Sequence, residues 1–266
     1  MNYWTGQSIA FANQRNYLDE LFKVYPLSPN IKRELNSNLV SEIEKNFSNR
    51  NDTELIKQLL KLELFPVKDS YAAFLRKDKT AIDRNPNTVS RLASYMYDMG
   101  LAQLFARAEE PKETNRQMGQ LFRNWLNKEL LGVKVFKNTD EFLGCSDNAI
   151  LNISDGLSKI FATEYLGYTH SKGLDFIARF NNKYVVGEAK FLTDNGGHQN
   201  AQFFDALAVR DSTFIDNKLG VQVIPIAILD GVLYIQSTSK MFKAITNDDN
   251  KITISALCLR EFLYSL

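Results

Sequence analysis

The chain has 266 residues, of which 44% are hydrophobic and 24% are charged, and these proportions are typical of a folded globular protein. They exclude a disordered, collagen-like or low-complexity chain. The 32 basic and 31 acidic residues give a formal net charge of +1, which excludes a polycation but does not describe local patches.

The sequence has no feature that is typical of a secreted or membrane protein. Its only cysteines, Cys145 and Cys258, are too few for a disulfide framework or a Cys-rich zinc site. The first residues lack the basic segment and apolar core of a secretory signal. The longest apolar run, at residues 224–229, is far shorter than the roughly 20 residues of a spanning helix. We therefore expect a cytoplasmic protein without membrane contact.

Residues 1–108 have the apolar periodicity of helices and predict a helical N-terminal region, a possible DNA-recognition part. Asn85-Pro86 predicts the start of a helix, because proline is favoured in the first helical turn. Gly100 is expected to end this helix before another begins. Two short helices around a glycine are typical of a helix-turn-helix and of many helical hairpins, so the pattern leaves both DNA recognition and simple packing open.

Residues 109–266 predict a second domain of the α/β or α+β class. Two β-rich runs flank Asn181-Asn182 and predict a hairpin. The other expected elements of this domain are helices over residues 114–131, 154–165 and 198–209, a buried strand over 221–229, a turn at Asp230-Gly231 and a strand over 232–235.

Three charged residues, Asp175, Glu188 and Lys190, interrupt the apolar strands of the hairpin. Glu188 and Lys190 are two positions apart, so in a strand they project from the same face, and hairpin pairing can bring Asp175 close. Two carboxylates at one point repel each other unless a cation lies between them. Oxygen ligands with open positions suit Mg²⁺, and a neighbouring lysine can stabilise the charge on a phosphate or activate the attacking water. Metal-assisted phosphodiester hydrolysis requires this set of groups.

The spacing alone is not specific. An acid two positions before a lysine also occurs, in polar or loop-like contexts, at Glu110/Lys112, Asp216/Lys218 and Asp249/Lys251. Only Glu188 and Lys190 lie in a strand pattern with an acid on the preceding strand. A surface ion pair on an edge strand, worth roughly 0–1 kcal/mol, is the other interpretation of the spacing.

The surrounding residues add a family resemblance. The segments in question are Gly173-Leu174-Asp175-Phe176-Ile177-Ala178-Arg179-Phe180 and Gly187-Glu188-Ala189-Lys190-Phe191, with the residues that follow to Phe203. Together they resemble the catalytic core of type II restriction endonucleases of the PD-(D/E)xK nuclease superfamily. Residues 115–126 resemble the helix that precedes this core. Leu174 stands where such motifs often have proline.

The resemblance implies a central mixed sheet flanked by helices, and Mg²⁺-dependent cleavage of double-stranded DNA at a short specific sequence. Carried over by motif, Asp175, Glu188 and the Ala189 carbonyl hold the metal, and Lys190 positions or activates the water. A cognate DNA methyltransferase is implied as a companion. A homodimer is expected, because two strands need two active sites. The helix that precedes the core has side-chain amides where some relatives carry an acidic metal ligand. The number of metal ions at the site, one or two, is therefore left open.

Candidates for DNA contact lie on both sides of the motif. After Lys190 the chain is rich in side-chain amides, which can pair with adenine, and the candidates there are Asn195, Gln199, Asn200 and Gln202. Before it, Lys112 and Arg116 are candidates for phosphate contact within residues 110–134, which contain five basic and three acidic residues. Residues 68–91 contain six basic and three acidic residues. A capped helix with a polar, solvated face is the structural alternative.

Two other functions are compatible with the sequence. One is a repair or recombination nuclease on the same core, which recognises DNA structure rather than sequence. The other is a non-catalytic DNA-binding regulator that uses the helices of residues 85–106, with the Asp175, Glu188 and Lys190 set as a surface ion pair.

Overall fold

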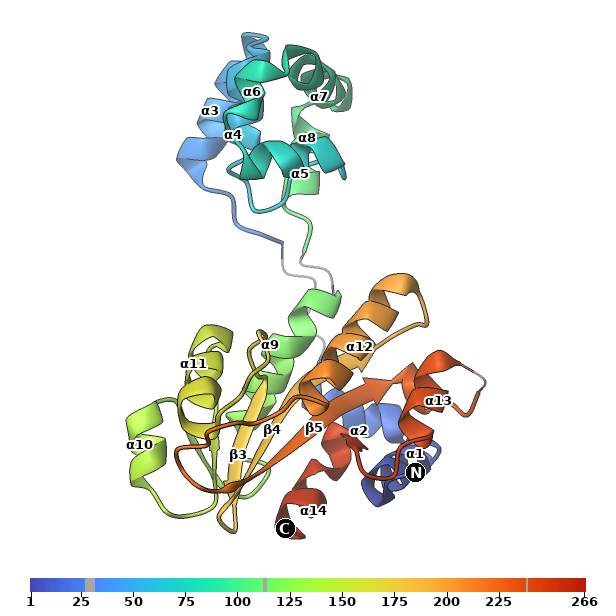
Figure 1. Cartoon of the computed structure of the whole chain (residues 1–266). Helices are drawn as coiled ribbons and strands as arrows, with labels where there is room; N and C mark the ends of the chain where they lie inside the picture. Colours follow the sequence, from blue (N-terminus) through green and yellow to red (C-terminus); the bar gives the residue numbers. More distant parts are fainter. Residues whose placement is uncertain (27–31, 112–113, 238) are drawn as a thin grey trace. The chain divides into compact units, whose positions relative to one another are not determined.

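The computed structural model divides into two compact units, Met1–Leu27 with Glu113–Leu266, and Ser28–Lys112 (Figure 1). It describes residues 1–26, 32–111, 114–237 and 239–266, but not the side chains of residues 114–116. The second unit is an insertion in the chain between the two parts of the first. The first 27 residues group with the sheet and not with the helical unit. No helix of the described residues is long and apolar enough to cross a membrane.

The unit Ser28–Lys112 is helical. Its helices are α3 (Ser37–Ser48), α4 (Asp52–Leu59), α5 (Ser70–Lys77), α6 (Ala81–Arg84), α7 (Pro86–Met99) and α8 (Leu101–Ala108). Side chains such as Ile43, Leu55 and Leu92 form a core of its own. Pro86 starts α7 as predicted, since the first turn of a helix leaves its N–H groups unpaired. Gly100, with a φ of 77°, separates α7 from α8.

Six strands of the described residues form one mixed sheet in the order β1 to β6. The strands are β1 (Lys134–Phe136), β2 (Ala149–Leu151), β3 (Phe176–Phe180), β4 (Lys183–Leu192), β5 (Gln222–Gly231) and β6 (Ile252–Ile254). β3 is antiparallel to both of its neighbours, and the other pairs are parallel. This sheet and its flanking helices confirm the expected α/β class and form a restriction-endonuclease-like fold.

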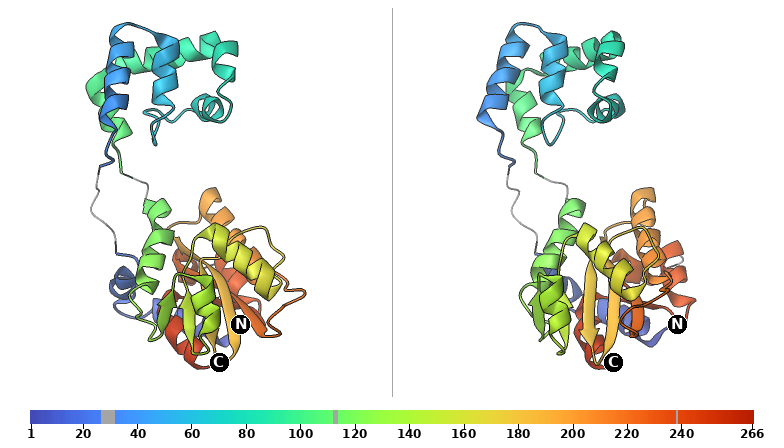
Figure 2. Two further views of the ribbon diagram at one scale, coloured as in Figure 1. Left: turned by 90° about the vertical axis from the view of Figure 1, so that its left-hand side faces the viewer. Right: turned by 60° about the vertical axis from the view of Figure 1, so that its left-hand side comes forward.

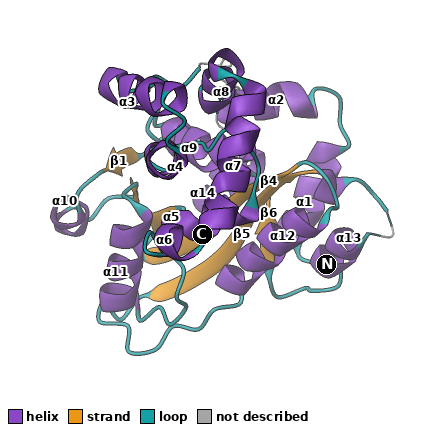
Figure 3. Ribbon diagram, turned by 90° about the horizontal axis from the view of Figure 1, so that it is seen from above, coloured by secondary structure: helices purple, strands orange, loops and turns teal. Residues whose placement is uncertain are grey.

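Helices cover both faces of the sheet (Figures 2 and 3). They are α1 (Tyr3–Ala12), α2 (Tyr17–Val24), α9 (Thr114–Leu126), α10 (Thr139–Gly144), α11 (Asp155–Leu166), α12 (Gly197–Arg210), α13 (Lys240–Thr246) and α14 (Leu259–Tyr264), with short 3-10 helices at Val232–Tyr234 and Ala256–Cys258. Successive strand residues point to opposite faces. Accordingly, Ile177 and Phe161 of α11 belong to one apolar cluster, whereas Phe176 contacts Phe122 of α9 in another.

Buried hydroxyl groups attach α1 to the edge strand of the sheet. Thr5 Oγ1 donates a hydrogen bond to the Thr253 carbonyl at 2.9 Å, and Ser8 Oγ accepts one from the Ser255 N–H at 2.9 Å. Buried backbone groups must be paired to be stable. These side chains therefore pair backbone groups in and just after β6, and the start of the chain forms part of the sheet unit.

The prediction of a turn at Asp230-Gly231 and of a strand over residues 232–235 is wrong. β5 extends through Gly231, and Val232–Tyr234 form a 3-10 helix. The Asp-Gly pair is typical of exposed turns, but Asp230 is fully buried. The strand therefore continues past the point at which its local sequence indicates an end.

Neutral hydrogen-bond donors surround the Asp230 carboxyl group. Ser255 Oγ donates to it at 2.5 Å, the Tyr25 hydroxyl at 3.1 Å and the Ala256 N–H at 3.2 Å. Burial raises the pKa of Asp230 to about 6, although these hydrogen bonds act in the opposite direction. The network joins α2, β5 and the segment after β6.

Candidate active site

The hairpin of β3 and β4 brings the three predicted residues together. Asn181 and Asn182 both have a positive φ, 47° and 60°, which is the geometry of a two-residue turn that fixes strand register. In this register the Asp175 N–H donates to the Gly187 carbonyl at 3.0 Å. Asp175 therefore lies next to Glu188 at the open end of the hairpin.

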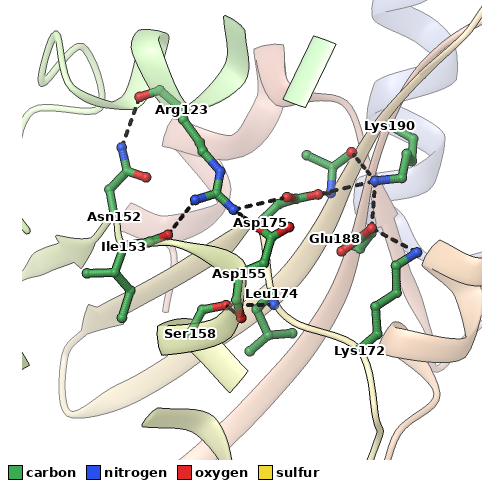
Figure 4. A network of polar contacts seen from close by, with 11 residues as sticks. Arg123, Asn152, Ile153, Asp155, Ser158, Lys172, Leu174, Asp175, Glu188 and Lys190 are labelled. Carbon is green, nitrogen blue, oxygen red and sulfur yellow. Dashed lines mark hydrogen bonds and ion pairs between the residues drawn. The ribbon is translucent and has the colours of Figure 1, made fainter. Parts of the chain in front are cut away.

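One ammonium group contacts all three oxygen donors that the family resemblance assigns to a metal. Lys190 Nζ lies 2.6 Å from Glu188 Oε1, 3.3 Å from Asp175 Oδ2 and 3.1 Å from the Ala189 carbonyl (Figure 4). Asp175 Oδ2 also accepts the Ala189 N–H at 3.0 Å. Both carboxylates thus converge on a single cationic nitrogen.

Burial and neighbouring charges act together on these groups. Burial raises the pKa of the Glu188 carboxyl group, the charge of Asp175 raises it further, and Lys190 and Lys172 oppose the increase. Burial lowers the pKa of Lys190, but Asp175 and Glu188 outweigh this effect, so the pKa is raised. Lys190 is therefore an ammonium ion at neutral pH.

Arg123 of α9 is a second basic residue at this site. Its Nη2 lies 3.7 Å from Asp175 Oδ1 and also pairs with Asp155 at the start of α11. Figure 4 shows that Arg123 and Lys190 approach Asp175 from opposite sides. In the sequence, Arg123 is only one of the basic residues of a helix, and periodicity alone does not show that it faces a carboxylate.

Lys172, in the segment before β3, is the third basic residue. Its Nζ lies 3.0 Å from Glu188 Oε1 and 3.2 Å from Asp205 Oδ2 of α12. The only signal for it in the sequence is its position three residues before Asp175. This spacing alone does not distinguish Lys172 from the other lysines of the chain.

The donor set fits a magnesium-like ion with open coordination positions. The set contains only two acidic side chains. Larger groups, of three or more His, Cys, Asp or Glu side chains that could hold a metal, do not occur in the described part of the chain. Two carboxylates and one backbone carbonyl are hard oxygen donors, and Mg²⁺ binds to few protein ligands because it retains several waters. A closed zinc site needs four ligands, mostly nitrogen or sulfur, which this set does not provide.

Three of the amide residues proposed for DNA contact lie around the start of α12. Asn195 is exposed in the preceding loop, and its carbonyl accepts the Asn200 side-chain amide at 2.7 Å. Gln202 is half-buried, and its Nε2 lies 3.0 Å from His198 Nε2. These contacts hold the side chains close to the helix, at the end of β4 that carries Lys190.

The remaining candidates for DNA contact are placed differently. Gln199 is buried, and its Oε1 accepts the Thr193 N–H at 3.4 Å, so it does not belong to the exposed face of α12. Lys112 and the side chain of Arg116 lie outside the described residues.

Comparison with family models identifies the family of the chain. The family model described as Tsp45I type II restriction enzyme matches residues 2–266, which include both compact units. Searches of curated proteins and of solved structures gave no match. The chain therefore belongs to the Tsp45I type II restriction enzyme family, and it is a site-specific deoxyribonuclease that acts on double-stranded DNA.

Proposed function

We propose that Asp175, Glu188 and Lys190 form the reaction centre of a Mg²⁺-dependent endonuclease of the PD-(D/E)xK type. One observation supports this proposal above all. The two carboxylates and the Ala189 carbonyl all lie within 3.3 Å of one cationic nitrogen, so the chain gathers oxygen donors around a positive charge. In the proposal these three groups hold the divalent ion.

A divalent ion held by Asp175, Glu188 and the Ala189 carbonyl would polarise the scissile phosphate and lower the pKa of a bound water molecule. The chain's own groups do the positioning. Lys190, as an ammonium ion, orients the attacking water and stabilises the negative charge that the phosphate gains in the transition state. The Ala189 N–H and Lys190 orient the Asp175 carboxylate before the substrate arrives. The products carry 5′-phosphate and 3′-hydroxyl ends.

The biological setting follows from this chemistry. We propose a homodimer, because two strands need two reaction centres and a palindromic target matches a two-fold axis. The enzyme works in the cytoplasm with a cognate DNA methyltransferase that protects the same sequence. Asn195, Asn200 and Gln202 are the amides proposed to face the bases, with Lys112 and Arg116 on the phosphates.

Digestion of unmethylated phage DNA tests the proposal. We expect discrete, reproducible fragments with Mg²⁺, and none with a chelator or with the Asp175→Asn variant. Asp216→Asn is the matched control, because this exposed acid has the same spacing to a lysine in a loop. Sequencing the fragment ends gives the recognition sequence and the cut position.

Two outcomes would contradict the proposal. Undiminished cleavage in the presence of the chelator would show that no divalent ion is needed. Wild-type cleavage by Asp175→Asn would place the reaction centre elsewhere in the chain.

A further inference from the structure

The Lys172 ammonium group lies between two carboxylates of very different exposure. It is 3.0 Å from Glu188 Oε1, whose side chain is 4% exposed, and 3.2 Å from Asp205 Oδ2, whose side chain is 61% exposed. Lys172 therefore has one buried partner at the reaction centre and one solvent-facing partner on α12.

Glu188 Oε1 carries a second ammonium group, because Lys190 Nζ lies 2.6 Å from the same oxygen. Two like charges on one oxygen repel each other. A divalent ion held by Glu188 adds more positive charge there, so the repulsion between the cations favours the departure of one ammonium group.

Lys172 is the group that can move at the lower cost. Its side chain is 34% exposed, against 23% for Lys190, and its second acceptor is at the surface. Asp205 is also not a proposed ligand of the ion, whereas the further acceptors of Lys190, Asp175 and the Ala189 carbonyl, are.

We propose that Lys172 is a displaceable counter-ion of Glu188, which transfers fully to Asp205 when a divalent ion binds. It has this role only if Glu188 holds the ion, as in the proposed function. Lys172 is then a positioning residue that acts through Glu188. Because Asp205 belongs to α12, the ion pair also links metal binding to the helix that carries Asn200 and Gln202.

Two substitutions, alone and combined, test this role. Lys172→Met removes the competing ammonium group, so Mn²⁺ is expected to bind about fivefold more tightly. Asp205→Asn removes the alternative acceptor and leaves the ammonium group on Glu188, so Mn²⁺ is expected to bind about threefold more weakly. The two charges alone also shift the affinity in opposite directions, so the double variant Lys172→Met/Asp205→Asn decides. If Asp205 acts by accepting Lys172, Asp205→Asn has no effect once Lys172 is replaced, whereas independent charge effects add.

Binding of Mn²⁺ to the full chain without DNA is measured by electron paramagnetic resonance, in which the signal of the free ion decreases as the ion binds. Lys159→Met and Glu164→Gln, at exposed positions of α11, change the net charge by the same amounts and are the matched controls. Lys172→Arg keeps the charge and is expected to keep the wild-type affinity. Circular dichroism shows that each variant is folded.

Opposite shifts in Lys172→Met and Asp205→Asn, with the double variant matching Lys172→Met, support the counter-ion role. Additive shifts, shifts in the same direction, or no shift beyond that of the controls overturn it while leaving the metal site in place. Glu188→Gln tests the metal site separately. If it binds Mn²⁺ as tightly as the wild type, the proposed metal site is wrong and the counter-ion role fails with it.

Discussion

Glu188 and Asp230 are buried acids on the neighbouring parallel strands β4 and β5, and burial raises the pKa of both. Their partners differ. Glu188 is contacted by the ammonium groups of Lys190 and Lys172, whereas Asp230 accepts hydrogen bonds from hydroxyl groups and a backbone N–H.

This difference separates a candidate reaction centre from a structural network. Neutral donors fixed in the core satisfy a carboxyl group permanently, and removing the acid leaves them unpaired. Ammonium groups on mobile side chains neutralise a carboxylate but can be replaced by another cation. Burial and a raised pKa are common to both acids, so the type of partner distinguishes their roles.

The sharpest test of the comparison is at Lys190. We expect Lys190→Ala to reduce the cleavage rate by at least about a thousandfold, because the charge on the phosphate loses its stabilising partner. DNA binding should stay largely intact. Single-turnover cleavage and gel-shift assays measure the two effects, and Lys218→Ala, with the same spacing to an acid, is the control. Undiminished cleavage by Lys190→Ala would remove the basis for the site.

Asp230→Ala should affect stability and leave the chemistry unchanged. The substitution leaves the Tyr25 and Ser255 hydroxyls and the Ala256 N–H without their acceptor, and we expect the free energy of unfolding to fall by about 4 kcal/mol. Urea unfolding measures this loss. The cleavage rate per folded molecule should match the wild type, and a loss of rate without a loss of stability would assign Asp230 to the reaction centre.

The raised pKa of Asp230 predicts a dependence of stability on pH. Its folded-state pKa of about 6 lies above the ordinary 3.8, so the folded protein holds the proton more tightly. The contribution of this bound proton to the free energy of unfolding is fully present below about pH 4 and is lost as the pH rises through about 6. The unfolding free energy of the wild type relative to Asp230→Asn should therefore fall by up to about 3 kcal/mol between about pH 4 and pH 7. A rise over this window would contradict the assignment.

The smallest expected effect concerns the turn that sets the hairpin register. Asn182 has a φ of 60°, so Asn182→Ala should cost about 1 kcal/mol of unfolding free energy, whereas Asn182→Gly should be nearly neutral. Thermal or urea unfolding distinguishes the two variants. Both should retain the wild-type cleavage rate, since the turn lies at the opposite end of the hairpin from Asp175 and Glu188.

The convergence of Asp175, Glu188 and Lys190 could be predicted because it depends on local geometry. Side chains two positions apart share a face of a strand, and the Asn181-Asn182 turn brings the preceding strand alongside. The general α/β class likewise follows from short-range periodicity.

The contacts of Arg123 and Lys172 depend on tertiary packing and could not be predicted in the same way. Each reaches a carboxylate because a helix or loop packs against the sheet, which no short-range pattern encodes. The burial of Asp230 is a similar case, because its partner Tyr25 is 205 residues away in the chain. The helix predicted to reach residue 131 ends at Leu126, and Glu129 has a φ of 55°, which an α-helix cannot continue through.

The hydrogen bond between Thr5 and Thr253 has a consequence for folding during protein synthesis, because the two residues are 248 positions apart. At roughly 5–20 residues per second, tens of seconds pass on the ribosome between the appearance of α1 and that of its partner strand. The helical unit Ser28–Lys112 is consecutive in the chain and can complete its core in that interval. We expect the nuclease sheet to close only after β6 has left the ribosome, so that a nascent chain still lacking β6 does not yet cut DNA.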